Sequence, residues 1–268
     1  MRISVIIPTY KPKDYIGECL NSLTNQTFPK TDFEVIIVLN GCDEPWQSEI
    51  EDYISINMPD MNVKFLQTNV GGVSNARNIA IDAATGEYVT FIDDDDYVSH
   101  GYLEHLFNKA DNDTVVLSNT IAFDDYSKRV ISDYPLSDVY KRCSTTDNVC
   151  LSSIARKYFA GPCMKLIPMK CIQARRFDVR FKNGEDSLFM FLISDNIKSI
   201  RFSNDEAIYY RRYRESSAIT RKGSMKDRMI NSAMLIKEYC TIALKHRVNV
   251  LFFITRILGA IKSVFLTY

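Results

Sequence analysis

The sequence is poor in the residues that build zinc sites and disulfide frameworks. Its 268 residues include only three histidines, His100, His105 and His246, which are too few and too widely spaced to indicate a zinc site. The seven cysteines are an odd number and include no Cys-x-x-Cys pair. We therefore expect reduced thiols in the core of a cytosolic protein.

Long apolar runs are also missing. No segment reaches about 18 uncharged apolar residues, the length that a membrane-spanning helix needs, so we expect no such helix. The apolar run at residues 3–7 starts too early and is too short for a signal peptide, and it is typical of a first strand.

A net charge is absent as well, because 33 Lys and Arg balance 33 Asp and Glu. Nothing in this balance indicates a nucleic-acid partner. The charge is unevenly distributed, however. Residues 201–268 contain 13 basic and 5 acidic side chains, a net charge of +8, so residues 1–200 carry −8. An acidic body could bind a metal ion, and a basic end could bind phosphates or anionic lipid.

The first hundred residues alternate between continuous apolar runs and stretches with helical spacing. Continuous apolar strands separated by helices predict a parallel sheet that is covered on both faces. The predicted strands are residues 3–7, 33–39, 63–66 and 88–92, and the predicted helices are residues 15–23, 46–56 and 74–84.

Three of these strands end in polar residues. The strand ends are residues 8–10, residues 40–43 and the four consecutive carboxylates Asp93–Asp96. In parallel sheets ligands bind at the carboxyl ends of the strands, so we expect all three to line one crevice. Four adjacent carboxylates repel one another, and oxygen ligands favour Mg²⁺ or Mn²⁺. The alternative is a solvated acidic turn.

A second carboxylate pair, Glu185-Asp186, follows Gly184 and precedes an apolar run with helical spacing. This pattern places carboxylates in the first turn of a helix, where the helix dipole favours an anion. It indicates either a catalytic site or ordinary charge placement at a helix start.

Several segments resemble family-2 glycosyltransferases with the GT-A fold, of the bacterial surface-polysaccharide type. The order and spacing of the first four agree with the family over roughly the first hundred residues, and those further along agree more thinly. The segments are residues 3–10 (ISVIIPTY), 33–41 (FEVIIVLNG), 69–78 (NVGGVSNARN) and 91–97 (FIDDDDY), then residues 165–167, 176–178, 184–189 and 209–217.

The resemblance implies an α/β protein with a Rossmann-like, mostly parallel sheet and helices on both faces. A smaller acceptor-side region and a C-terminal helical segment would complete it. Residues 1–100 would form the donor half, residues 101–220 the acceptor and catalytic half of the same domain, and residues 221–268 the helical segment.

The activity implied by the resemblance is that of an inverting glycosyltransferase of the hexosyltransferase class. It would transfer a sugar from a nucleotide-diphosphate sugar, with UDP favoured, to a glycan or lipid-linked glycan acceptor. Asp186 would be the general base, and Glu185 would orient the acceptor or the base. Asp95 and Asp93 would hold Mn²⁺ or Mg²⁺. The residues expected to contact the nucleotide-sugar are Pro8, Thr9, Tyr10, Asn40, Arg77, Asp93, Asp94 and Arg212.

One position departs from the family pattern. Many relatives carry an Asp-Asp pair where this chain has Leu39-Asn40, so Asn40 would read the nucleobase without a charge. Two other functions remain open. A sugar-phosphate nucleotidyltransferase would need a Gly-rich loop that residues 8–12 lack. An inactive glycan-binding protein would not need Asp93, Asp95 and Asp186.

The basic end of the chain has two features that each allow two interpretations. Arg211, Arg212 and Arg214 with Ser216 and Ser217 would close over the diphosphate, or would be a strand edge paired with the acidic body. Residues 248–268 form an apolar stretch that Arg256 and Lys262 interrupt. We expect a helix packed on the core, with an exposed basic edge at Arg247, Arg256 or Lys262. The alternative is a helix on the membrane surface. The protein would be cytoplasmic, or peripheral on the inner face of the membrane.

Overall fold

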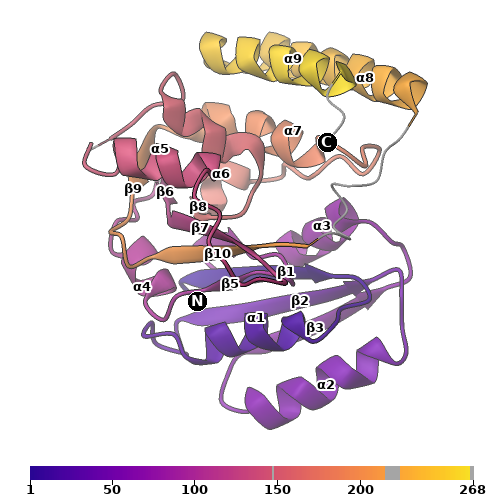
Figure 1. The fold of residues 1–268 in the computed structure, drawn as a ribbon, viewed down its shortest axis with the longest axis vertical. Coiled ribbons are helices and arrows are strands. Elements are labelled where there is room, and N and C mark those ends of the chain that lie inside the picture. Colours follow the sequence, from indigo (N-terminus) through magenta and orange to yellow (C-terminus); the bar gives the residue numbers. More distant parts are fainter. Residues whose placement is uncertain (147, 215–223, 266–268) are drawn as a thin grey trace.

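A computed structural model of the chain describes residues 1–146, 148–214 and 224–265 (Figure 1). Its main feature is a seven-stranded sheet in the order β3-β2-β1-β4-β8-β6-β9. Strands β1, β2, β3 and β4 are mutually parallel, while β8 runs antiparallel to both β4 and β6. The strands are β1 (Ile3–Thr9), β2 (Phe33–Asn40), β3 (Val63–Thr68), β4 (Tyr88–Phe91), β6 (Thr114–Leu117), β8 (Lys165–Pro168) and β9 (Ser199–Phe202).

The alternation of strands and helices that the sequence predicts in the first hundred residues is confirmed. Every residue of β1, β2 and β4 is buried, which explains why their apolar runs are continuous. The edge strand β3 is only half-buried. The three helices between the strands are α1 (Tyr15–Thr24), α2 (Trp46–Asn57) and α3 (Val73–Ala83).

A smaller three-stranded sheet, in the order β5-β10-β7, lies beside the acidic segment. Its strands are β5 (Tyr97–Val98), β7 (Asn119–Asp124) and β10 (Ile208–Tyr213). Since β5 follows Asp93–Asp96 directly and β10 carries Arg211 and Arg212, this sheet brings the basic segment against the acidic strand end.

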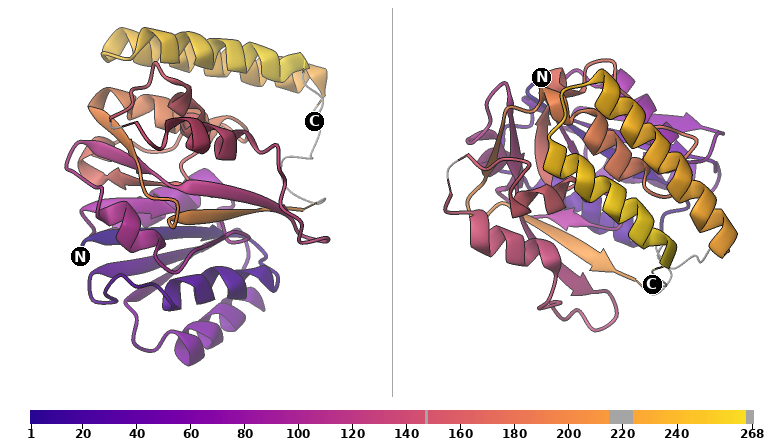
Figure 2. Two further views of the ribbon diagram at one scale, coloured as in Figure 1. Left: turned by 60° about the vertical axis from the view of Figure 1, so that its left-hand side comes forward. Right: turned by 90° about the horizontal axis from the view of Figure 1, so that it is seen from above.

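The remaining helices surround the second half of the large sheet. They are α4 (Tyr102–Phe107), α5 (Pro135–Cys143), α6 (Met169–Ile172), α7 (Glu185–Leu192), α8 (Met225–Lys245) and α9 (Val250–Phe265), with the 3-10 helices η1 (Ile154–Ala160) and η2 (Ser194–Asn196). Helices α8 and α9 lie side by side at the end of the molecule opposite to α2 (Figures 1 and 2). In the described part of the chain, no helix has the length and hydropathy to cross a bilayer.

The C-terminal helix α9 packs on the protein with one face only. Phe252 is fully buried, and its ring contacts those of Phe159 and Phe191 at centroid distances of 6.1 and 5.5 Å. The exposed basic edge expected at Arg247, Arg256 or Lys262 is present at Arg247 and Lys262. Arg256 is only partly exposed and donates to Ser187 Oγ at 2.8 Å. Residues 266–268 of the predicted helix lie outside the described residues.

All seven cysteines are free thiols in the structure. Four of them, Cys19, Cys143, Cys163 and Cys171, are buried as expected. Cys150 and Cys240 are exposed, so the expectation of core thiols does not extend to them.

Candidate active site

The ends of the three predicted strands lie together. Thr9, the last residue of β1, donates its hydroxyl to Asp94 Oδ2 at 2.6 Å. The Asn40 amide donates to the Thr9 carbonyl at 2.7 Å, and its oxygen accepts from the backbone N–H of Gly72 at 2.8 Å. Asn40 is buried and therefore links β1, β2 and the start of α3. A nucleobase would have to use its remaining hydrogen-bonding capacity.

The four carboxylates of the acidic segment have different surroundings. Asp96 is buried and accepts hydrogen bonds from the Tyr209 hydroxyl and from the backbone N–H of Arg212, both at 2.7 Å. Its carboxylate therefore ties β10 to the end of the segment. Asp94 points back toward β1 through Thr9. Burial raises the pKa of Asp94 to about 7, and the charges of Asp95 and Asp93 add to this effect.

Asp95 is paired with Arg214. The Arg214 Nε donates to Asp95 Oδ2 at 2.9 Å, and its Nη2 contacts the same oxygen. Burial and the charge of Asp93 raise the pKa of Asp95, and Arg214 opposes this shift. The guanidinium also lies 4.4 Å from the centre of the Tyr15 ring.

Arg77 joins the two carboxylate sites that the sequence predicts. It is only 3% exposed, and α3 aims it at the strand end. Its Nη1 donates to Asp186 Oδ1 at 2.5 Å, and its Nη2 donates to Asp93 Oδ1 at 3.0 Å. Burial lowers the pKa of Arg77, but the two carboxylates more than reverse this and raise it above its ordinary value.

The second carboxylate site stands at the start of α7. Gly184 precedes the helix with a φ of 86°, a left-handed conformation that glycine adopts readily. Burial raises the pKa of Asp186, while Arg77 opposes the shift. Burial and the neighbouring Asp186 charge raise the pKa of Glu185 to about 7. Glu185 is buried, and its Oε2 has no hydrogen-bond partner among the described residues.

Three polar groups of the protein hold the Arg212 guanidinium in place. Its Nε donates to the carbonyl of Asp95 at 2.7 Å, its Nη1 donates to Asp125 at 2.6 Å, and its Nη2 contacts Glu18. Sequence reasoning missed Glu18 and Asp125, because nothing local links them to residue 212. The Ser216 and Ser217 of the predicted basic cluster lie outside the described residues.

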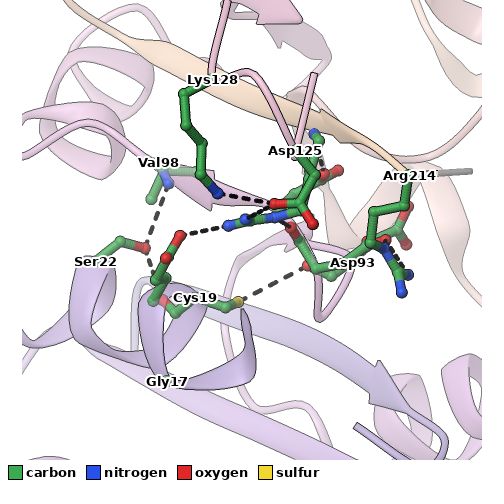
Figure 3. Close-up of polar contacts among 12 residues, drawn as sticks. Gly17, Cys19, Ser22, Asp93, Val98, Asp125, Lys128 and Arg214 are labelled. Atoms are coloured by element: carbon green, nitrogen blue, oxygen red, sulfur yellow. Dashed lines mark hydrogen bonds and ion pairs between the residues drawn. The ribbon is translucent and has the colours of Figure 1, made fainter. Parts of the chain in front are cut away.

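Helix α1 holds the acidic segment from the other side. The Cys19 thiol lies 3.8 Å from the Asp93 carbonyl, and the Ser22 hydroxyl accepts from the Val98 N–H at 3.3 Å (Figure 3). These contacts reach backbone groups at Asp93 and at Val98, just beyond the segment, and do not use its carboxylates. Of the predicted nucleotide contacts, Pro8 is buried within β1, while Tyr10 just beyond it is 53% exposed.

The carboxylates suit a divalent cation that a ligand helps to bind. Within the described residues, no group of three or more His, Cys, Asp or Glu side chains is arranged to hold a metal. Mg²⁺ and similar ions commonly use one or two carboxylates together with substrate phosphates and water. Asp95 and Asp93 could supply two such ligands, and a cation would offset the burial and the mutual repulsion that together raise the pKa of Asp94 and Asp95.

Comparison with known proteins places the chain among glycosyltransferases. A family model described as glycosyl transferase family 2 matches residues 4–160. The poly(ribitol-phosphate) beta-N-acetylglucosaminyltransferase TarS of Staphylococcus aureus is 31% identical over 220 residues, which are 80% of this chain and 36% of that protein. A poly(ribitol-phosphate) beta-glucosyltransferase of Bacillus spizizenii is 30% identical over 216 residues, 78% of this chain and 32% of that protein. The chain thus spans about a third of the length of these relatives.

Solved structures agree with the sequence match. The structure of S. aureus TarS 1–349 in complex with UDP-GlcNAc has a TM-score of 0.76 and 25% identity, covering 99% of this chain and 73% of that one. A mannosyltransferase of Pyrobaculum calidifontis, in complex with GDP-Man and Mn²⁺, has a TM-score of 0.64 at 18% identity over 99% of this chain and 70% of that one, and shows the fold alone. Because the family model covers more than half of the chain, this protein belongs to glycosyl transferase family 2, and its fold is GT-A.

Proposed function

We propose that the chain is an inverting glycosyltransferase that transfers a sugar from a nucleotide-diphosphate sugar, UDP favoured, to a glycan or lipid-linked glycan. The observation that carries the proposal is the double ion pair of Arg77. It holds Asp93, at the end of the donor strand, and Asp186, at the start of α7, on one guanidinium. A nucleotide-sugar bound at the strand end and the Asp186 carboxylate would then both lie near one acceptor hydroxyl.

Asp186 would act as the general base. Arg77 contacts only Oδ1 of Asp186, while Oδ2 faces Gly161, where a Cβ would lie 3.7 Å from this oxygen. In the reaction the acceptor hydroxyl gives its proton to Asp186, and its oxygen bonds to the anomeric carbon. The bond from that carbon to the diphosphate breaks at the same time, so the configuration inverts. Buried Glu185, with its free oxygen, would orient the acceptor.

On the donor side, Asp95 and Asp93 would hold Mn²⁺ or Mg²⁺. A divalent cation there would neutralise the charge that develops on the diphosphate leaving group. The exposed Tyr10, with Pro8, Thr9 and Asn40 behind it, would receive the nucleoside. Asp94, which accepts from Thr9, lies between these two carboxylates in the chain and would contact the nucleotide-sugar.

Two arginines of the basic segment would have different tasks. Arg212 was expected at the nucleotide-sugar, and its bonds to Glu18 and Asp125 leave it best suited to support the site through the Asp95 carbonyl. Arg214 pairs with a single carboxylate oxygen and is about 20% exposed, so it can turn from Asp95 toward the diphosphate.

The choice of donor and acceptor rests on the relatives. UDP is supported by the complex of TarS with UDP-GlcNAc at 25% identity. The names of the curated relatives point to polymers of ribitol phosphate for those proteins. For this chain we propose a growing surface glycan, made in the cytoplasm and held at the inner face of the membrane when it is lipid-linked.

A thermal-shift screen of UDP, GDP and dTDP, with and without Mn²⁺, tests the donor. Asp186→Asn tests the base. We expect it to keep the UDP-dependent shift and to lower turnover of UDP-GlcNAc by roughly 10²–10⁴-fold. The matched control is Asp111→Asn, an exposed carboxylate away from the site. Wild-type turnover by Asp186→Asn, or loss of its UDP-dependent shift, would contradict the assignment. UDP binding without any turnover by the wild type would favour an inactive glycan-binding protein.

A further inference from the structure

The outer face of α9 is apolar and open. Helix α9 buries Phe252, Ala260 and Val264 against the protein. Six other apolar side chains follow one another at helical spacing on the opposite side, each between 43 and 71% exposed, and the exposed charged residue of the helix is Lys262. They are Val250, Leu251, Ile254, Leu258, Ile261 and Phe265.

The outer side of α8 extends this surface. Both helices contact the same residue of α7, because the Tyr239 hydroxyl lies 2.9 Å and Arg256 Nη1 lies 2.8 Å from Ser187 Oγ. The two helices therefore pack against α7 with one side each, and the view from above in Figure 2 shows them side by side. The exposed apolar residues of α8 are Met225, Met229, Ile230, Met234 and Leu244. We call these eleven side chains the α8–α9 outer face.

The charges around this face are almost all positive. Within residues 224–265, the exposed cations are Lys226, Lys237, Lys245, Arg247 and Lys262. The exposed carboxylate of the same described segment is Asp227, which is used in the capping box with Ser224. Glu238 is partly buried and pairs with Arg180 at 2.9 Å.

We propose that the α8–α9 outer face docks on the surface of an anionic lipid bilayer. A bilayer interface offers both an apolar layer and negative charge, which are the two properties that this face complements. The axes of both helices would lie along the membrane plane, with the apolar side chains inserted and the lysines at the headgroups. This inference names the surface by which the proposed glycosyltransferase would contact the membrane. Its evidence comes from α8 and α9 and does not depend on the proposed reaction.

The test is co-sedimentation of the full chain with vesicles of 30% phosphatidylglycerol in phosphatidylcholine, without donor or acceptor. We expect the wild type to bind, and Leu258→Asp to weaken binding by roughly tenfold or more, because it places a charge in the inserted layer. Ile56→Asp on α2 is the matched control. Ile56 is 74% exposed at the opposite end of the molecule, so binding should stay unchanged.

The charges are tested separately. Lys237→Glu with Lys262→Glu should weaken binding to the same vesicles by well over tenfold, since each lysine near an anionic surface contributes roughly fivefold. Binding of the wild type should fall with salt and should be weak on pure phosphatidylcholine. Leu258, Lys237 and Lys262 are exposed, so circular dichroism should show that these variants are folded.

Several results would overturn the proposal. The first is that the wild type does not bind the vesicles, and the second is that Leu258→Asp binds them as well as the wild type does. The third is that the wild type does not bind vesicles but forms a dimer in sedimentation velocity, which Leu258→Asp dissociates. The last result would assign the face to a second copy of the chain. Turnover of the soluble donor UDP-GlcNAc is measured in parallel. Turnover that persists in Leu258→Asp separates a failure of membrane docking from a failure of the proposed activity.

Discussion

Arg77 is the residue on which the geometry of the site depends most. It lies in α3 but contacts carboxylates from the end of β4 and from α7, so it connects three elements with one side chain. Each ion pair alone would be ordinary. Together they give one buried guanidinium two partners, and loss of the guanidinium would leave Asp93 and Asp186 without the cation that they share.

We predict that Arg77→Gln lowers the free energy of unfolding by roughly 2 kcal/mol. In the double variant with Asp186→Asn, the loss should be smaller than the sum of the single losses, because the variants share one interaction. Urea unfolding at pH 7 in EDTA measures both. The control is Arg176→Gln, which removes a more exposed pair with Asp82 and should cost less than about 1 kcal/mol. Strict additivity would show that the bridge does not couple the two sites.

Glu185 makes stability depend on pH. Its pKa is raised to about 7 in the folded protein, from 4.5 as the ordinary value, so the folded state keeps a proton that the unfolded state loses. Its contribution to stability is therefore present below about pH 4.5 and is lost as the pH rises through about 7. We predict that, as the pH rises from about 4.5 to 7 and above, Glu185→Gln gains stability relative to the wild type by an amount on the order of 3 kcal/mol.

Urea unfolding of both proteins from pH 4 to 8, without metal, measures this difference. A difference between variant and wild type that stays constant over the whole range would show that the Glu185 carboxyl is not perturbed.

At the scale of elements, the start of α7 depends on a single glycine. Gly184 has a φ of 86°, and a Cβ at this position would lie 2.7 Å from Leu235 Cδ1 of α8. The same residue therefore sets the direction from which α7 presents Glu185 and Asp186, and leaves room for α8.

We predict that Gly184→Ala lowers the free energy of unfolding by roughly 1–3 kcal/mol and also lowers donor turnover. The control is Gly259→Ala in α9, where a Cβ meets nothing within 4 Å and the backbone is helical. That change should instead gain about 0.5–1 kcal/mol. Thermal unfolding of both variants decides, and a Gly184→Ala protein as stable as the wild type would contradict the argument.

The basic strand β10 shows why a cluster in sequence need not be a cluster in space. Neighbouring residues of a strand point to opposite faces. Arg211 donates to the Tyr134 hydroxyl at 3.1 Å, whereas Arg212 faces the acidic segment. Arg214, two residues further, reaches Asp95. This alternation could have been foreseen from the sequence, but the identity of each partner could not.

At the scale of the whole molecule, one sheet runs through both halves of the chain. Strand β8 pairs with β4 on one side and with β6 on the other, so the strands of residues 1–100 and those that follow share one set of hydrogen bonds. We therefore expect both halves of the chain to unfold together, and a ligand bound at the strand ends to stabilise both.

We predict that saturating UDP with Mn²⁺ raises the midpoint of thermal unfolding in a single transition, on the order of 5 °C. Asp95→Asn should remove most of the Mn²⁺-dependent part of this rise in the unfolding midpoint, while the variant remains folded. Asp111→Asn should keep the full shift. If Asp95→Asn retained wild-type turnover in buffer treated with EDTA, Asp95 would not be a metal ligand.

The sequence by itself determined the order of strands and helices in the first hundred residues and where the polar strand ends fall. Apolar periodicity is a local property, and each strand needs only its own residues to show it. The sequence also located both groups of carboxylates, because the residues of each group are adjacent in the chain, and their roles remain predictions.

Only the tertiary structure decided what each of these carboxylates touches. Asp96 binds Tyr209, Asp95 binds Arg214, and Asp93 and Asp186 share Arg77. These partners are far apart in the sequence, and no local pattern encodes which side chains meet. The same holds for α9. Its composition suits the core and the membrane surface equally, and packing against α7 and α8 decided which face is buried and which remains open.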